Sequence, residues 1–263
     1  MGNRTMRIAL TIAGSDSGGG AGIQADLKTF HRFGVFGASV ITAITAQNTL
    51  GVTRWSAVDT ELIRAQIDAV ATDLRPGAVK SGMLADAAVV STVAAALREH
   101  GLAPYVLDPV MVATSGDLLL EREAVGAIAR ELLPLADLVT PNLDETEILI
   151  GEPVRDVPAM ERAARLLVER HGARAALVKG GHLTGDTTTD VLFDGDLTHF
   201  THARVDTTST HGTGCTLSSA IAAHLALGVP LREAVPIALD YVHRAIATAP
   251  GLGGGHGPLN HFA

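Results

Sequence analysis

Short apolar runs alternate with longer amphipathic stretches along most of the chain. Residues 7–14 (RIALTIAG) and 38–45 (ASVITAIT) are two such runs, and the segments between runs repeat apolar residues at helical spacing. This alternation is typical of repeated strand–helix units that build a parallel sheet. The pattern predicts strands over residues 7–14, 38–45, 77–84, 105–110, 137–142 and 175–181. It predicts helices over residues 21–34, 60–74, 87–101, 121–133, 144–151, 158–172, 214–228 and 231–249, and it assigns no element to residues 52–59.

One late segment breaks this pattern. Residues 187–205 contain two β-like runs on either side of Asp194-Gly195, a dipeptide that is typical of hairpin turns. We therefore predict an antiparallel edge on a mostly parallel sheet, and we expect the Thr60 hydroxyl to cap the helix that begins there. No stretch has the composition of a linker, so residues 1–263 are expected to form one α/β domain.

Composition narrows the possible partners. Hydrophobic residues make up 47% of the 263 and aromatic residues only 3%, so the core must be built from Ala, Val, Leu and Ile. The formal net charge of −8 argues against a nucleic-acid backbone or an anionic membrane as the main partner. Cys215 is the single cysteine, and no apolar run has the length of a signal peptide or a membrane span. We expect a cytoplasmic protein.

Polar clusters follow the predicted strands at their carboxyl ends. They are GSDSGGGAG, TAQNT, KSGML, DPVMVATSGD, TPNLDE and KGGH, in chain order, with HGTGCT standing before a later helix. In open α/β sheets, ligands gather beyond the carboxyl ends of the strands. We therefore expect these clusters to form one site.

The glycine-rich opening loop does not fit either common phosphate motif. A Walker A loop needs Lys followed by Ser or Thr after its last glycine, whereas Gly20 is followed by Ala21, Gly22 and Ile23. The same glycines do not give the G-x-G-x-x-G fingerprint of dinucleotide-binding proteins, which disfavours an oxidoreductase. The simplest alternative is a tight connection between a strand and a helix.

HGTGCT is the stronger candidate for an anion site. Gly212, Thr213 and Gly214 lead into a helix, so backbone N–H groups without intrahelical partners could stabilise a transferring phosphoryl group there. Cys215 would lie in the first turn, where the helix dipole is expected to lower the thiol pKa below its ordinary value of about 8.5. The alternative is that Cys215 is a small buried hydrophobic residue facing the sheet.

Two strand ends supply oxygen ligands of the kind that Mg²⁺ prefers. Asp108 follows one predicted strand, and Asn142 with Glu145 follows the next. Mg²⁺ usually takes one or two protein carboxylates, often through water, together with substrate phosphates. The alternative for Asp144 and Glu145 is an ordinary acidic first turn of a helix.

Three further polar residues stand in or next to predicted strands. Lys179 follows a predicted strand and precedes two glycines, so it is a candidate point charge for phosphate or else a solvated lysine. His199 and His202 are separated by an odd offset within a β segment, which directs their side chains to opposite faces. We expect neither a shared metal nor a catalytic role for these two histidines.

Taken in order, these motifs resemble those of the hydroxymethylpyrimidine and phosphomethylpyrimidine kinases of thiamine biosynthesis. The resemblance runs from AGSDSGGGAGIQADLKTF through TAITAQNT, KSGML, DPVMVATSGD, TPNLDE, VKGGH and HGTGCTLS to the closing GHGPLNHF. It implies a ribokinase-like three-layer sandwich and a kinase that uses ATP and Mg²⁺. The substrate would be 4-amino-5-hydroxymethyl-2-methylpyrimidine and then its monophosphate, and relatives are commonly homodimers.

The resemblance also implies roles for individual residues. It assigns the opening loop to the pyrimidine, which would contact Gly14, Asp26, Gln47, Met83 and Val110. An amide such as that of Gln47 can offer a donor and an acceptor together to an aminopyrimidine edge.

On the nucleotide side, the resemblance places the ATP phosphates near Lys179, Asp108 and the turn from Gly212 to Gly214. Cys215 stands where related sugar kinases have an aspartate base, so it is expected to accept the proton of the substrate hydroxymethyl group. Many relatives have Lys at the position of Thr114, so a phosphate contact from this segment is expected to be weaker or to come from elsewhere. Gly116 beside Ser115 suits the hinge of a mobile lid and equally suits a plain turn.

Two rival functions stay open. A pyridoxal or pyridoxine kinase would also bind a flat ring with a hydroxymethyl group, although Gln47 and Met83 favour the pyrimidine. A non-catalytic pyrimidine sensor on the same fold would be expected to lack Asp108, Glu145 or Cys215, and all three are present.

Overall fold

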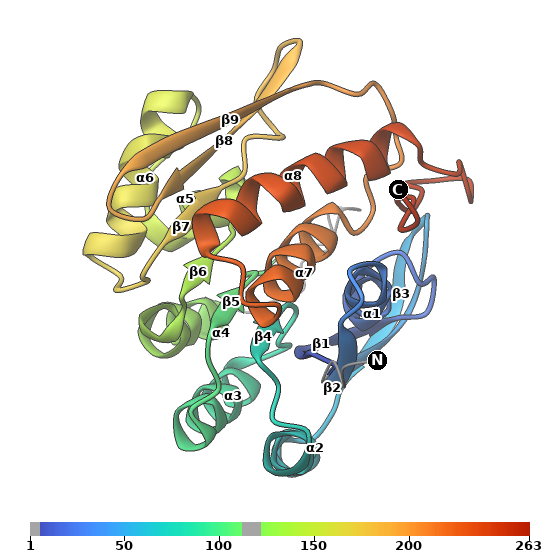
Figure 1. Cartoon of the computed structure of the whole chain (residues 1–263), viewed down its shortest axis with the longest axis vertical. Coiled ribbons are helices and arrows are strands. Elements are labelled where there is room, and N and C mark those ends of the chain that lie inside the picture. Colours follow the sequence, from blue (N-terminus) through green and yellow to red (C-terminus); the bar gives the residue numbers. More distant parts are fainter. Residues whose placement is uncertain (1–5, 112–121) are drawn as a thin grey trace, which may run out of the picture.

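Strands from both halves of the chain pair in one nine-stranded sheet in the computed structural model, which describes residues 6–111 and 122–263. The strands are β1 (Ile8–Asp16), β2 (Phe36–Asn48), β3 (Gly51–Ala57), β4 (Ala78–Ser81), β5 (Tyr105–Leu107), β6 (Leu138–Val139), β7 (Ala176–Val178), β8 (Thr187–Phe193) and β9 (Leu197–Ala203). Their order across the sheet is β3-β2-β1-β4-β5-β6-β7-β8-β9 (Figure 1).

The centre of the sheet is parallel and both of its edges are antiparallel. Strands β2, β1, β4, β5, β6 and β7 pair in parallel, whereas β8 runs antiparallel to both β7 and β9. The predicted hairpin at Asp194-Gly195 is therefore confirmed. At the other edge, β3 pairs antiparallel with β2, which the apolar pattern did not predict. Because every residue of β3 is at least partly exposed, its sequence carries no buried period that could have indicated a strand.

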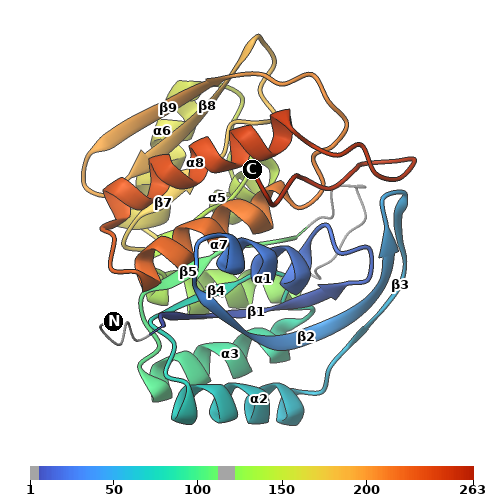
Figure 2. The same ribbon diagram turned by 45° about the vertical axis from the view of Figure 1, so that its right-hand side comes forward.

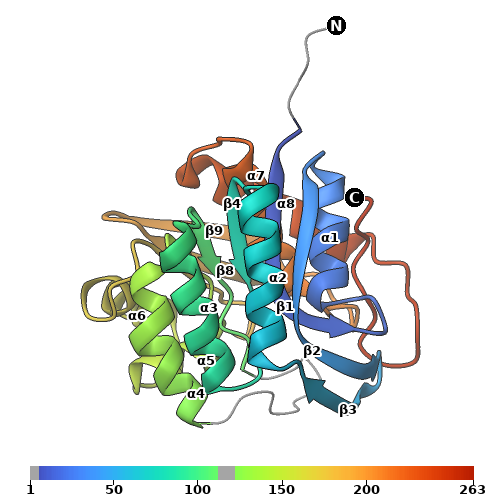
Figure 3. The same cartoon turned by 90° about the horizontal axis from the view of Figure 1, so that it is seen from below.

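Helices cover both faces of the sheet (Figures 1 and 3). On one face lie α1 (Gly22–Arg32), α7 (Thr213–Ala226) and α8 (Leu231–Ala247). On the other lie α2 (Thr60–Asp73), α3 (Ala87–His100), α4 (Arg122–Ala127), α5 (Leu143–Ile150) and α6 (Val157–Glu169). A π turn (Ile128–Leu132) and a 3₁₀ turn (Leu133–Leu135) continue α4. The expected layers of helix, sheet and helix are confirmed.

Two hydrophobic layers hold these helices on the sheet. Along β1, Leu10 and Ile12 face the layer under α2 and α3, whereas Ala9 faces the layer under α7 and α8. The middle of α7 presents buried small residues, including Ala220 and Ala223, to the sheet. Small side chains let α7 approach the strands closely, so this core needs few aromatic residues.

The start of α2 differs from the prediction. The helix begins at Thr60 as expected, but its cap is Asp59, whose carboxylate accepts a hydrogen bond from the backbone N–H of Leu62 at 2.8 Å. The Thr60 hydroxyl is therefore not the cap. Thr60 occupies the first helical position, and the residue before it has the extended backbone that a cap requires.

The order of the strands reverses direction beside β1. The chain passes from β1 to β2 on one side and returns to β4 on the other, so the strand order reverses at β1 (Figure 2). At such a reversal, the loops that leave adjacent strands diverge and leave space for a ligand beyond the carboxyl ends. The ends of β1 and β4, at Asp16 and Ser81, mark this place.

Candidate active site

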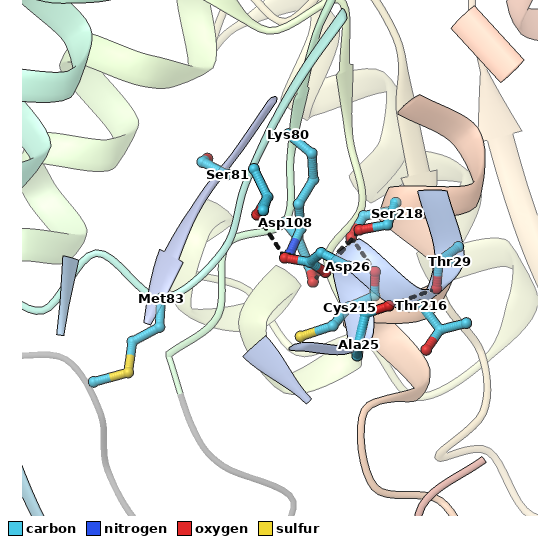
Figure 4. Close-up of polar contacts among 12 residues, drawn as sticks. Ala25, Asp26, Thr29, Lys80, Ser81, Met83, Asp108, Cys215, Thr216 and Ser218 are labelled. Carbon is cyan, nitrogen blue, oxygen red and sulfur yellow. Dashed lines mark hydrogen bonds and ion pairs between the residues drawn. The ribbon is translucent and has the colours of Figure 1, made fainter. Parts of the chain in front are cut away.

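A buried ion pair joins β4 and α1, beside the place where the strand order reverses. The Lys80 ammonium on β4 is 3.0 Å from each carboxylate oxygen of Asp26 on α1, and both side chains are completely buried (Figure 4). The same carboxylate accepts hydrogen bonds from the hydroxyls of Thr11 on β1, at 2.6 Å, and Ser219 on α7, at 2.7 Å. One carboxylate therefore joins two strands and two helices. Asp26 lies below the site without solvent exposure, and its predicted contact with the acceptor stays a prediction.

The turn that precedes α7 is packed against the opening loop. Gly212 has a φ of +83°, and a Cβ there would overlap the carbonyl oxygen of Gly20. Only glycine tolerates both constraints. Thr213 begins the helix, and its hydroxyl donates to the carbonyl of Thr210 at 2.7 Å. The N-terminus of α7 is thus held at one fixed place beside the opening loop.

Cys215 is half-buried in the first turn of α7, beside Asp26 (Figure 4). Burial raises the pKa of its thiol to about 11; the Lys80 ammonium opposes this rise, and the carboxylates of Asp26 and Asp108 reinforce it. The backbone N–H of Gly22 donates to the sulfur, which also favours the thiolate. The expectation that the helix dipole would lower this pKa is therefore wrong. Burial and two nearby negative charges outweigh a partial charge from the backbone.

Burial and nearby negative charge shift the pKa of Lys80 in opposite directions. Burial alone would lower the pKa of its ammonium, but the negative charges of Asp26, Cys215 and Asp108 raise that pKa above its usual range. Lys80 therefore remains a cation beneath the first turn of α7.

A second ion pair lies at the ends of β5 and β7. The Lys179 ammonium is 3.2 Å from a carboxylate oxygen of Asp108, which is 1% exposed. Asp108 also accepts from the hydroxyls of Thr140 and Ser218, each at 3.3 Å. A Cβ at Gly214 would lie 3.0 Å from the Lys179 nitrogen, so glycine leaves room for the lysine beside α7. The structure thus brings together Asp108, Lys179 and the turn that sequence reasoning singled out separately.

Asn142 and Glu145 form the cap of α5. The Asn142 side chain accepts from the Glu145 N–H at 2.9 Å, and the Glu145 carboxylate accepts from the Asn142 N–H at 2.8 Å. Burial raises the pKa of Glu145 to about 7, against the influence of Lys179 and with that of Asp108. Asp144, in contrast, is exposed and lies 3.4 Å from His182. Asp144 and Glu145 therefore do form the acidic first turn of α5, as the alternative prediction had it, and Glu145 takes part in its cap.

No compact cage for a metal ion is present in residues 6–111 and 122–263. There, no three side chains of the His, Cys, Asp or Glu type converge as ligands. The negative charge of Asp108 nevertheless contributes to the raised pKa of Glu145, and both carboxylates raise the pKa of Lys179. A divalent cation would therefore have to bring most of its ligands with it.

A small apolar cluster, which we call the apolar wall, lies near the ends of β2 and β4. Met83 packs with Ala43, Ala85 and Val110 in a small cluster of its own, apart from the charged groups (Figure 4). A Cβ at Gly14 would lie 3.2 Å from the Met83 sulfur, so the glycine allows this close contact. Gly14, Met83 and Val110, each predicted from the resemblance to contact the pyrimidine, are thereby brought together.

Gln47 lies at the end of β2 and is tied to the opening loop. Its backbone N–H donates to the Ser17 hydroxyl at 2.8 Å, and that hydroxyl donates to the Gln47 carbonyl at 2.7 Å. The Gln47 side-chain oxygen accepts only a longer bond, of 3.3 Å, from the Thr45 hydroxyl. The amide is half-buried and is held mainly through its backbone.

Sequence reasoning missed the centre of the opening loop. The Asp16 carboxylate accepts from the backbone N–H groups of Gly18, Gly20 and Ala21 at 2.8 to 3.0 Å and from His211 Nε2 at 2.9 Å. Burial opposes its ionisation, but His211 and the backbone donors outweigh that effect and lower the Asp16 pKa. The glycines therefore wrap the loop around its own carboxylate. An aspartate two residues before a glycine run was the available signal, whereas nothing in the sequence pointed to His211 as its partner.

The remaining candidates lie apart from this site. Thr114 and the lid predicted around it fall outside the described residues. His199 contacts Glu161 of α6 at 2.8 Å, whereas His202 contacts Asp240 of α8 at 3.0 Å, so the two histidines face opposite sides of the sheet as predicted. Among the described helices, none is long and apolar enough to cross a membrane.

Known proteins resemble this chain over nearly its whole length. A sequence model of the phosphomethylpyrimidine kinase family matches residues 16–260. The hydroxymethylpyrimidine/phosphomethylpyrimidine kinase of Rhizobium meliloti is 56% identical, over 97% of this chain and 97% of its own length.

Two solved structures share the fold. The phosphomethylpyrimidine kinase of Clostridium difficile superposes with a TM-score of 0.82 at 41% identity, covering 91% of this chain and 99% of that one. The pyridoxal kinase of Bacillus subtilis, solved as an ADP complex, superposes with a TM-score of 0.90 at 36% identity over 98% of each chain. These similarities confirm the ribokinase-like fold.

The raised pKa of Cys215 predicts unusual alkylation kinetics. Iodoacetamide reacts with the thiolate, so its rate with the folded protein should keep rising up to about pH 11, whereas the urea-unfolded protein should level off near pH 8.5 to 9. Because the chain contains a single cysteine, intact mass reports on this thiol alone. A rate for the folded protein that levels off below pH 9 would contradict the balance of charges described above.

Proposed function

The chain belongs to the phosphomethylpyrimidine kinase family, and we infer that it uses ATP to phosphorylate 4-amino-5-hydroxymethyl-2-methylpyrimidine and then the resulting monophosphate. Both activities are in the name of the Rhizobium meliloti relative. The observation that carries this conclusion is the extent of the family match, which includes the apolar wall, both ion pairs and the α7 turn. The product places the chain in thiamine biosynthesis.

In each step an acceptor oxygen of the substrate attacks the γ-phosphorus of ATP. The new phosphorus–oxygen bond forms as the bond to the bridging oxygen of ADP breaks, and ADP leaves. In the first step the hydroxymethyl group loses its proton, and we propose Cys215 as the acceptor, acting through the small thiolate fraction that a pKa of about 11 leaves at neutral pH. Phosphoryl-transfer transition states are loose, so this proton leaves late and positioning matters as much as basicity. The Lys80 ammonium beneath the turn stabilises the thiolate form.

The phosphates of the nucleotide are proposed to lie against Lys179 and the turn from Gly212 to Gly214. The N-terminus of α7, which has no side-chain cap, and the positive end of its dipole favour an anion there. Lys179 adds a full positive charge next to Gly214, where no side chain obstructs it. These groups stabilise the charge that spreads over the transferring phosphoryl oxygens.

Asp108 and Glu145 fit a Mg²⁺ ion that arrives with the nucleotide. Mg²⁺ usually takes only one or two protein carboxylates, because phosphates and water complete its coordination shell. In the part of the chain that the structure describes, no cluster of three such ligands is present, which agrees with this. Asn142 commits its side-chain oxygen to the helix cap, so it would reach such an ion through water. When bound, the ion would neutralise charge on the phosphates.

The pyrimidine is proposed to lie between the apolar wall and Gln47. Met83 and Val110 offer a flat apolar surface, and the Gln47 amide supplies a donor and an acceptor for the aminopyrimidine edge. Pyridoxal is the second candidate substrate, because the Bacillus subtilis pyridoxal kinase shares both the fold and 36% of the sequence.

We also propose a cytoplasmic homodimer of single-domain subunits. One sheet contains strands from both halves of the chain, which supports a single domain. The edge ribbon of β2 and β3 exposes Ile44 by 59% and Trp55 by 41%, which supports burial against a second copy. A single cysteine suits the reducing cytoplasm.

The proposed substrate predicts two successive products. With ATP and Mg²⁺, hydroxymethylpyrimidine should yield its monophosphate and then its diphosphate, resolved by mass, with matching release of ADP. Pyridoxal should be a much poorer acceptor under the same conditions. Efficient turnover of pyridoxal with little of the pyrimidine would overturn the substrate assignment, and binding of the pyrimidine without any turnover would favour a sensor.

The proposed proton acceptor predicts a loss of turnover without a loss of binding. Cys215→Ala should lower kcat by roughly ten- to ten-thousandfold, the range of general base catalysis with allowance for a loose transition state. The KM for ATP should change little, because the Gly212 to Gly214 backbone is retained. A variant with wild-type kcat would remove Cys215 from the reaction.

A further inference from the structure

The segment after α8 lies across the carboxyl ends of β1 and β2. We call residues 251–263 the C-terminal strap; Figure 2 shows it in red, extending from α8 toward the tip of β3. Its sequence, GLGGGHGPLNHFA, contains five glycines, and none of the roles proposed above uses them. The contacts of the strap explain why glycine is needed.

The first contact of the strap is with Thr49, two residues after Gln47. The His256 N–H donates to the Thr49 carbonyl at 2.8 Å, and the Gly255 N–H donates to the Thr49 hydroxyl at 3.4 Å. A Cβ at Gly253 would overlap the Thr49 side chain, and one at Gly255 would overlap the Thr49 carbonyl oxygen. The strap therefore presses directly against the end of the strand that bears Gln47.

The second contact is with the turn that leads into α7. The His211 N–H donates to the Gly257 carbonyl at 3.1 Å, and His211 forms a parallel bridge with Pro258. His211 is the residue that binds the Asp16 carboxylate in the opening loop. Pro258 also lies against Gly20 of that loop. The strap thus touches the end of β2 that bears Gln47, the opening loop and the turn before α7.

The end of the strap is anchored on the helix layer. His261 Nε2 lies 3.3 Å from the Thr216 hydroxyl in α7, and the Tyr241 hydroxyl of α8 donates to the His261 carbonyl at 3.1 Å. The Asn260 N–H donates to the Ala245 carbonyl at 3.0 Å. Because both ends of the strap are held on α7 and α8, its middle can fix the position of Thr49.

We propose that Gly255 is a positioning residue for the pyrimidine: through Thr49 it holds Gln47 at a set distance from the N-terminus of α7. The inference rests on the proposed function, in which these two places bind the ring and the phosphates. A displacement of about 1 Å between reacting groups costs on the order of 100-fold in rate, so such a tie is needed at a site built from separate loops. Glycine at position 255 is what allows the contact.

The matched variants are Gly255→Ala and Gly254→Ala. Both positions lack a positive φ, but a Cβ at 254 would meet only Leu50 Cδ2, at 3.9 Å, whereas one at 255 would overlap the Thr49 carbonyl. We expect Gly255→Ala to raise the KM for hydroxymethylpyrimidine about tenfold and to leave the KM for ATP within about twofold. Gly254→Ala should match the wild type in both constants and in Tm.

Coupling to Gln47 separates positioning from general destabilisation. If Gly255 acts through Gln47, adding Gly255→Ala to Gln47→Ala should raise the KM for the pyrimidine by less than about twofold. A wild-type KM for Gly255→Ala would overturn the inference. Full additivity with Gln47→Ala, or equal rises in both KM values, would also overturn it. If Gly255→Ala does not fold, Thr49→Ala removes the hydroxyl that accepts from the Gly255 N–H and should raise the KM for the pyrimidine and not that for ATP.

Trp55 provides a readout that does not depend on activity. It is the only tryptophan, and it lies on β3 opposite Thr45, in the ribbon that ends at Thr49. Displacement of Thr49 should change acrylamide quenching of Trp55 in Gly255→Ala but not in Gly254→Ala. If quenching changes in Gly255→Ala but the wild type does not turn over the pyrimidine, the proposed function has failed. If the wild type is active but quenching is unchanged in Gly255→Ala, the proposed positioning of Gln47 through Thr49 has failed.

Discussion

The ion pair of Lys80 and Asp26 is the interaction on which the rest of the structure depends. Both groups are completely buried, and a buried charge is tolerated only when it is paired and hydrogen-bonded. The hydroxyls of Thr11 and Ser219 complete the shell of the carboxylate, so β1, β4, α1 and α7 meet at one point. This junction fixes the start of α7 at the place where the strand order reverses.

The chemistry of the site follows from charges held near that junction. Lys80 lies beneath the first turn of α7, Asp108 pairs with Lys179 beside it, and Cys215 is half-buried among them with a pKa raised to about 11. Phosphoryl transfer asks a protein mainly for positioning and for stabilisation of spreading negative charge. Fixed cations, the N-terminus of α7 and an apolar wall are proposed to supply these, and the C-terminal strap is proposed to hold Gln47 at a set distance from the N-terminus of α7.

The apolar pattern predicted the parallel strands and the helices, because each has a local periodicity of apolar residues. It also predicted the late hairpin, because the turn dipeptide Asp194-Gly195 is a local signal. It did not predict β3, whose residues are all at least partly exposed, nor Asp59 as the cap of α2. Site residues at strand ends were found because topology brings such ends together. Lys80 and the Asp16–His211 pair were not found, since partners 54 and 195 residues apart leave no local signal. The pKa of Cys215 was misjudged for the same reason: the helix dipole is local, and the carboxylates that outweigh it are not.

The stability of Lys80→Met in denaturant tests most directly whether the buried pair holds the junction. Removing the ammonium leaves Asp26 as an uncompensated buried charge, so the free energy of unfolding should fall by about 3–5 kcal/mol. The double variant Lys80→Met/Asp26→Asn removes that charge while keeping an acceptor for the two hydroxyls, and it should regain most of the loss. A Lys80→Met protein that unfolds at the same denaturant concentration as the wild type would contradict the central place given to this pair.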